Sequence, residues 1–166
     1  MMLYVLRHAT AEDASAAGAD GARRLTADST EKMREAAQGM RAMELKFDLI
    51  LTSPLARAAE TAEIVAEAYG NAPAPQVLPA LGTGAPAASV VAELRAYAKF
   101  ESVLIVGHEP QLSAIASIAL AGSPDAAHLR LKTGACIAID LPARFERGGG
   151  ELRWMLTNRQ LRKMRK

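Results

Sequence analysis

The sequence has too few cysteines for a fold held together by disulfide bonds. Its 166 residues include one cysteine, Cys136, which excludes an internal disulfide and is typical of a reducing compartment. Cys136 lies in the apolar run 135–141, where we expect a packed structural thiol. The familiar metal-ligand spacings H-x-H, C-x-x-C and H-E-x-x-H are also missing. We therefore expect no bound metal and no cofactor.

The sequence also lacks long apolar runs and concentrated charge. No stretch reaches the roughly 18 consecutive apolar residues of a membrane-spanning helix. Arg7 interrupts the first apolar run, unlike a secretory signal. The net charge is +2, and the basic cluster Arg159–Lys166 is more typical of a solvated chain end than of a nucleic-acid-binding face. We therefore expect a cytoplasmic protein that binds neither membranes nor nucleic acids.

Apolar runs typical of buried strands alternate with helical patterns along the chain. We predict strands at residues 3–6, 47–52, 76–78, 102–106, 135–141 and 152–156. Helices are predicted at residues 26–43, 54–69, 87–99 and 110–121. With no linker and no repeat, the chain should form one domain over residues 1–166, ending in a short basic tail at about 159–166. The alternation predicts an α/β fold, a three-layer α/β/α sandwich with a mostly parallel central sheet.

Basic side chains follow three of these strands. Arg7 and His8 end the first strand, and His108 follows the strand at 102–106. After the strand at 47–52, Ser53 is a good helix N-cap, so Arg57 should project from the first turns of a helix. Ligands of open α/β sheets bind where strands end, and helix N-termini favour anions. The sequence therefore predicts a cationic pocket at one edge of the sheet.

A cationic pocket that contains an imidazole suits phosphoryl transfer. Arginine binds the non-bridging oxygens of a phosphoryl group with two parallel hydrogen bonds and stabilises charge in the transition state. A neutral imidazole can attack phosphorus and form a covalent phosphohistidine, which water then hydrolyses. The third histidine, His128, lies in a plainer region, where we expect a structural or exposed side chain.

Three motifs carry a resemblance to a known family. They are Leu6-Arg7-His8-Ala9, then Ser53–Ala58 with Glu60-Thr61-Ala62, and Val106-Gly107-His108-Glu109-Pro110. In order and separation they resemble the signatures of the histidine phosphatase superfamily, which includes phosphoglycerate mutases and acid phosphatases. The resemblance spans at least residues 2–122 and implies the phosphoglycerate mutase-like fold. The short chain and the residues of its first and third motifs most resemble those of the SixA-type phosphohistidine phosphatases.

The resemblance assigns roles to matching residues. It implies that His8 is the nucleophile and that Arg7, Arg57 and His108 bind and neutralise the phosphoryl group. His108 would be cationic when phosphate is bound. Arg24 is a weaker candidate for the rim of the pocket, and a surface charge near a helix start is an equal alternative.

The sequence departs from larger members of the family in its proton donor. Those members often carry a carboxylic acid in the segment after the second helix, whereas residues 78–86 contain none. Glu12 and Glu109 are possible substitutes, although Glu109 could instead cap the helix that follows it. Protonation of an alkoxide leaving group is worth typically 10²–10⁴ in rate. A phosphoramidate nitrogen departs more easily, so the missing acid favours a phosphohistidine substrate.

These features predict a metal-independent phosphatase that hydrolyses phosphohistidine on a signalling phosphotransfer protein through an intermediate on His8. The alternatives are a small-molecule phosphomonoesterase or mutase, a catalytically silent phosphate-binding module, and a nucleic-acid-binding protein that uses the basic tail. The presence of His8 speaks against a silent module. Few insertions separate the motifs, which favours an open cleft and a phosphorylated protein as substrate. The sequence leaves the oligomeric state open, with a monomer slightly favoured.

Overall fold

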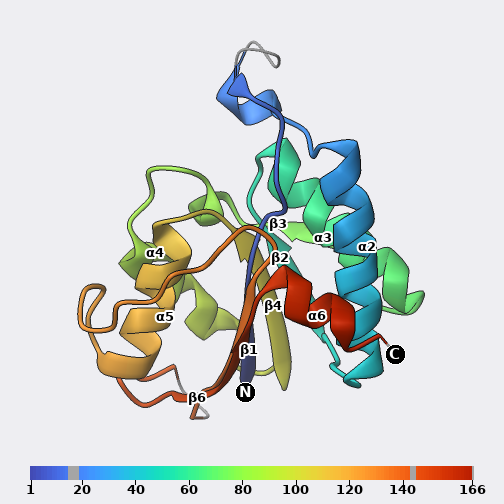
Figure 1. The fold of residues 1–166 in the computed structure, drawn as a ribbon. Helices are drawn as coiled ribbons and strands as arrows, with labels where there is room; N and C mark the ends of the chain where they lie inside the picture. Colours follow the sequence, from blue (N-terminus) through green and yellow to red (C-terminus); the bar gives the residue numbers. More distant parts are fainter. Residues whose placement is uncertain (15–18, 143–144, 166) are drawn as a thin grey trace.

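A six-stranded sheet forms the centre of the computed structural model, which describes residues 1–14, 19–142 and 145–165 (Figure 1). The strands lie in the order β3-β2-β4-β1-β5-β6. Their bounds are β1 Met2–Arg7, β2 Leu49–Thr52, β3 Gln76–Val77, β4 Ser102–Gly107, β5 Cys136–Asp140 and β6 Glu151–Leu156. Strands β1 to β4 are mutually parallel, and the β5–β6 hairpin adds antiparallel pairings at one edge. The predicted mostly parallel sheet is confirmed.

Helices cover both faces of this sheet, as predicted (Figure 1). The helices are α2 Ala27–Ala42, α3 Ala56–Tyr69, α4 Ala87–Leu94, α5 Gln111–Ala121 and α6 Asn158–Lys163, with short 3₁₀ turns η1 Asp20–Ala22, η2 Pro79–Leu81 and η3 Arg95–Tyr97. Helices α2, α3 and α6 pack on one face, and α4 and α5 pack on the other. No helix in the described ranges is long and apolar enough to cross a membrane.

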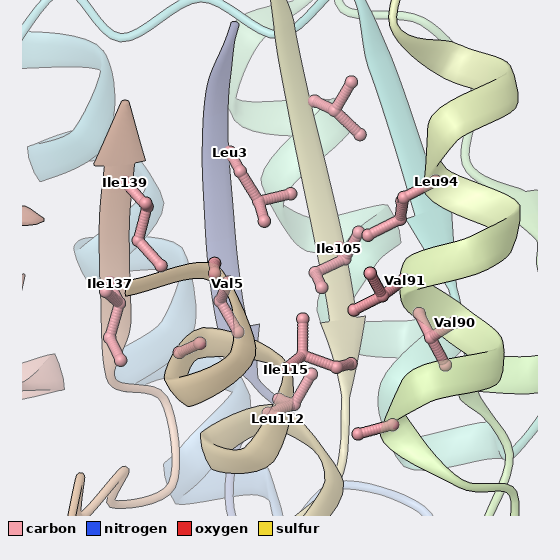
Figure 2. Packing of buried hydrophobic residues seen from close by; sticks show 14 of the residues in the cluster. Leu3, Val5, Val90, Val91, Leu94, Ile105, Leu112, Ile115, Ile137 and Ile139 are labelled. Atoms are coloured by element: carbon pink, nitrogen blue, oxygen red, sulfur yellow. The ribbon is translucent and has the colours of Figure 1, made fainter. Parts of the chain in front are cut away.

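Alternation along the central strands divides the core into two layers. In β1, Leu3 and Val5 point to the α4–α5 side, whereas Tyr4 and Leu6 point to the α2–α3 side. Figure 2 shows the first layer, in which Val5 of β1 lies near Ile115 of α5 and Ile105 of β4 lies near Val91 of α4. Because both faces are buried, β1 reads as a continuous apolar run. Packing on both faces holds the carboxyl ends of β1 and β4 in place.

Two helix starts differ from the predictions for a structural reason. Helix α2 is capped by Thr26, whose hydroxyl accepts a hydrogen bond from the Ser29 amide at 3.2 Å. In contrast, α3 begins at Ala56 instead of residue 54. The Ser53 hydroxyl accepts from the Leu55 amide at 3.2 Å, so residues 53–55 form a turn before the helix. Helix α5 likewise begins one residue late, at Gln111.

The basic chain end is a docked helix and not the solvated tail that its composition suggested. In α6, Leu161 is fully buried against α2. The two backbones approach so closely that a Cβ at Gly39 would lie 1.8 Å from the Leu161 carbonyl oxygen. Arg162 and Arg165 both pair with Glu35 of α2. Leu161 and the close approach at Gly39 therefore anchor a segment whose sequence is mostly charged.

Candidate active site

Strand register brings the two motif histidines together. Strands β1 and β4 are parallel neighbours with Arg7 opposite Gly107, so His8 and His108 follow at matching positions. The His8 amide donates to the Gly107 carbonyl at 3.1 Å, and the two imidazole centroids are 5.0 Å apart. The predicted meeting of these side chains at the carboxyl edge of the sheet is therefore what the structure shows.

The His8 ring has a defined tautomer. Its Nδ1 lies 2.6 Å from the Ala9 carbonyl oxygen. A carbonyl oxygen only accepts hydrogen bonds, so Nδ1 must carry the proton in this contact. A neutral His8 then has its lone pair on Nε2. This is the atom that can act as a nucleophile.

Burial is the main reason that His8 is neutral. Desolvation lowers the pKa of His8 to about 4. The hydrogen bond to the Ala9 carbonyl opposes this shift, and the charges of Arg57, Arg7 and Arg23 reinforce it in that order. At neutral pH the imidazole therefore keeps its lone pair, and the three nearby guanidinium groups help to keep it unprotonated.

Two buried nitrogen atoms near His8 have no hydrogen-bond partner within the described part of the chain. One is Nε of Arg7, whose Nη1 donates to the Leu131 carbonyl at 2.8 Å. The other is Nδ1 of His108, a side chain that is only 4% exposed. A buried polar group without a partner costs about 1–3 kcal/mol. Bound oxyanion oxygens would give both nitrogens an acceptor.

The opposite edge of the His108 ring is held by Ser53, which the sequence singled out only as a helix cap. His108 Nε2 and the Ser53 hydroxyl are 2.7 Å apart. Desolvation, then the nearby His8 and Arg57, lower the pKa of His108 to about 4. A neutral ring that accepts the Ser53 proton on Nε2 carries its own proton on Nδ1. His108 can therefore donate from the unpartnered nitrogen even before it gains a charge.

Arg57 is buried and not solvated, with 5% of its surface exposed. Its Nη1 donates to the Asp20 carbonyl at 2.7 Å, and its Nη2 donates to the Asp20 carboxylate at 3.1 Å. The other carboxylate oxygen accepts from Arg23 at 3.2 Å. The hydrogen bonds from Arg23 and Arg57 hold the pKa of Asp20 below its usual value. An anionic group thus already bridges two of the arginines.

Of the adjacent arginines before α2, the structure brings Arg23 and not Arg24 into this cluster. Arg23 also donates to the Glu12 carbonyl at 2.6 Å. The Arg24 side chain is 74% exposed and pairs with Glu60 of α3. The sequence therefore drew attention to the wrong member of the pair, because only the path of the loop decides which side chain turns inward.

Thr61 joins the loop after His8 to helix α3, which carries Arg57. Its hydroxyl accepts from the Ala9 amide at 3.1 Å and donates to the Arg57 carbonyl at 2.7 Å. The threonine is fully buried, so both bonds are shielded from water. Thr61 was part of the second motif, but its spacing of four residues from Arg57 was the unused signal for this link.

The two proton-donor candidates lie in different settings. Glu12 is exposed in the loop after β1. Glu109 is half-buried, and its carboxylate accepts from the Ser113 hydroxyl at 2.8 Å. Burial raises the pKa of Glu109 above its usual value. It also borders a pocket of about 450 Å³ that His108 lines, so Glu109 is the better placed of the two.

Because Asp20 competes for Arg57, we expect Asp20→Asn to tighten oxyanion binding. The amide keeps the shape of the side chain, and the Asp20 backbone carbonyl still accepts from Arg57, but the charge is lost. The inhibition constant of vanadate should fall about three- to tenfold, the range of a partly exposed charged contact. Asp140→Asn, near the chain start at the other end of β1, is the control. Unchanged or weaker vanadate inhibition in Asp20→Asn would contradict competition.

Comparison with known proteins identifies the class. The sequence model of the histidine phosphatase superfamily (branch 1) matches residues 3–82. An uncharacterized protein of Picosynechococcus sp. (strain ATCC 27264 / PCC 7002 / PR-6) is 38% identical over 144 residues, which are 84% of each chain. The chain belongs to the histidine phosphatase superfamily.

Solved structures with the same fold include several phosphatases. The protein histidine phosphatase SixA complexed with tungstate is 25% identical, with a TM-score of 0.83 over 97% of this chain and 99% of that one. The alpha-ribazole phosphatase from Shigella flexneri is 20% identical, with a TM-score of 0.76 over 95% and 97% of the two chains. The second likeness shows the shared fold alone. The neighbours thus include both a protein phosphatase and a small-molecule phosphatase.

Proposed function

We propose that this protein is a metal-independent phosphatase that removes the phosphoryl group from phosphohistidine on a signalling phosphotransfer protein. One observation carries the proposal: His8 has its lone pair on Nε2, its ring lies 5.0 Å from that of His108, and two buried nitrogens of this cluster, Arg7 Nε and His108 Nδ1, have no hydrogen-bond partner in the described part of the chain. His8 would serve as the nucleophile, and the two nitrogens would donate hydrogen bonds to the oxygens of a bound oxyanion. The similarity to SixA, solved with the oxyanion tungstate, supports the same assignment.

In the proposed first step, the phosphoryl oxygens bind Arg7, His108 and Arg57, and Asp20 leaves Arg57. His8 Nε2 forms a bond to phosphorus while the bond from phosphorus to the substrate nitrogen breaks. A substrate imidazole that is already protonated leaves as a neutral molecule, so the enzyme need not supply a proton. The negative charge on the phosphoryl oxygens raises the pKa of His108 while they are bound.

In the second step, water attacks the phosphoryl group on His8. The bond from phosphorus to His8 Nε2 breaks, and its electron pair returns to the ring as the lone pair. Both protons of the water leave with the phosphate, and Nδ1 keeps its proton on the Ala9 carbonyl throughout. The His8 ring therefore returns to its starting tautomer, and splitting one displacement into two lowers the barrier.

A small-molecule phosphomonoesterase is the second candidate function. It is favoured by Glu109, whose raised pKa and position on the His108 pocket suit a general acid. An alkyl ester leaves as an alkoxide and needs such a proton. The two functions therefore differ in their dependence on Glu109.

A paired turnover assay tests the proposed function. The enzyme, with a metal chelator present, is offered a phosphohistidine-bearing phosphotransfer domain and, separately, aryl and alkyl phosphates. Fast loss of phosphate from the protein, with slow ester hydrolysis and no effect of Glu109→Gln, is the expected result. Fast ester hydrolysis that Glu109→Gln abolishes would favour the second candidate. Binding of phosphate without turnover of any substrate would instead indicate a silent module.

The lowered pKa of His8 predicts how activity responds to acid. Because the folded pKa is about 4 and the ordinary value is about 6.5, the proton stays off Nε2 down to about pH 4. The value of kcat/KM should therefore show no loss from His8 protonation between pH 7 and 5, and should fall below about pH 4. The ring resonances in an NMR titration, assigned with His8→Ala, should move near pH 4. A midpoint near 6.5 would contradict the burial of this imidazole.

A further inference from the structure

We propose that a groove beside His8 docks an acidic surface segment of the phosphoprotein substrate, with Lys132 and Arg159 as the recognising charges. This inference rests on the proposed function and adds to it the chemical character of the partner. It also gives a role to the basic chain end, which the catalytic cluster does not use.

The groove begins at the residues that follow His8. It has a volume of about 420 Å³ and runs between the first turns of α2, residues 132–133 and the start of α6. Ala9 and Thr10, the two residues after His8, form its inner wall. The Thr10 and Thr133 hydroxyls are 3.2 Å apart and join two sides of the groove. A chain lying here would therefore pass along the two residues that follow His8.

Positive charge dominates the lining. The lining contains one acidic residue, Asp28, and four basic residues. The basic residues are Lys32, Lys132, Arg159 and Arg162. Two of them are neutralised, because Lys32 pairs with Asp28 at 2.6 Å and Arg162 pairs with Glu35. Lys132 and Arg159 are exposed and form no ion pair with any residue in the described ranges. These two side chains can therefore pair with carboxylates of a partner.

Lys132 and Arg159 both lie on backbone segments that tertiary contacts hold in place. Arg159 lies in the first turn of α6, which Leu161 and the Arg162–Glu35 pair hold against α2. Lys132 follows Leu131, whose carbonyl binds Arg7 of the catalytic cluster. The backbone positions of Lys132 and Arg159 relative to the His8 site are therefore fixed before a partner binds. Less conformational entropy of this protein is lost on binding as a result.

The lining favours a protein over a nucleic acid. Proteins that bind single strands combine a basic groove with aromatic side chains on which bases stack. The residues that line this groove include no aromatic side chain. Two unpaired cations also provide few of the phosphate contacts that nucleic-acid binding needs. A folded partner with two or three carboxylates beside its phosphohistidine fits the groove better.

Charge reversal tests this surface without disturbing the fold. Deleting residues 159–166 would remove Leu161 from the core, so we choose Lys132→Glu with Arg159→Glu. Lys46→Glu with Arg153→Glu, two exposed cations outside the groove, is the matched control. The substrates are a phosphohistidine-bearing phosphotransfer domain and free phosphohistidine, each at low and high salt.

We expect the groove variant to lose kcat/KM for the phosphoprotein by about tenfold or more at low salt, mainly through KM, with a smaller loss at high salt. Turnover of free phosphohistidine, and both activities of the control variant, should change less than about twofold. Equal losses on both substrates would overturn docking, because they would indicate damage to catalysis. Normal phosphoprotein kinetics in the groove variant would overturn docking alone. A native enzyme that hydrolyses only free phosphohistidine or esters would overturn the proposed protein substrate, and the docking site with it.

Discussion

Replacing His8 by alanine should abolish turnover while the pocket still binds vanadate. The methyl group has no lone pair to attack phosphorus, so the covalent route is closed. The oxyanion contacts of Arg7, Arg57 and His108 come from other side chains and remain. We expect turnover to fall by about a thousandfold or more, as for the loss of a nucleophile. The dissociation constant of vanadate should change far less.

The measurement pairs steady-state turnover with vanadate binding by calorimetry. His128→Ala is the matched control, since His128 is an exposed histidine elsewhere on the surface and its loss should leave both quantities unchanged. Acid quenching of the native enzyme during turnover should trap phosphate on a histidine, and the His8→Ala protein should trap none. Persistent turnover in His8→Ala would exclude the covalent mechanism.

Arg57→Ala should weaken oxyanion binding and turnover together. The guanidinium faces charge both in the bound substrate and in the transition state, so its loss affects KM as well as kcat. Removing one such donor typically costs about 10²–10³ in kcat. Its contacts with Asp20 show that the group is already oriented toward an anion. Asp20 would in addition lose both hydrogen bonds from Arg57.

Arg57→Lys separates charge from shape. A lysine restores the positive charge but cannot make two parallel hydrogen bonds, so we expect partial recovery of binding and little recovery of kcat. Arg24→Ala, which removes an exposed arginine from the loop before α2, should behave like the native enzyme. Thermal unfolding of each variant checks that the buried position tolerates the change. Normal kinetics in a folded Arg57→Ala protein would place Arg57 outside the reaction.

The sheet edge that carries His8 and His108 was predictable because its signals are local. Apolar runs that end in Arg7-His8 and in Gly107-His108 indicate buried parallel strands, and parallel strands end at the same edge of a sheet. The strand order places β1 and β4 side by side, so the two histidines meet. Thr26 and the αL glycine Gly70 likewise mark helix ends through their own backbone chemistry.

The sequence could not settle contacts that depend on how distant segments approach one another. Arg23 and Arg24 are chemically equal neighbours, and only the loop between β1 and α2 turns one toward Asp20 and the other toward Glu60. Ser53 resembles a helix cap until β2 and β4 bring it within 2.7 Å of His108. Glu60 lies 36 residues from Arg24, and His108 lies 55 residues from Ser53.

At the basic chain end, too, the sequence indicated the composition but not the tertiary contacts. Its composition alone determines that it is basic, and a charge run without a visible apolar period is typical of a solvated segment. Tertiary packing decides otherwise, because Gly39 leaves room on α2 for the backbone of α6 and lets Leu161 enter the core. The sequence by itself therefore determined the six strands, helices α2 to α5 and the basic side chains at the carboxyl edge of the sheet. Only the folded structure decided the partner of Arg57 and the groove beside Ala9 and Thr10, because both depend on the approach of segments that lie far apart in the chain. It also decided the tautomer of His8, because that depends on how the folded chain turns the ring toward the adjacent Ala9 carbonyl.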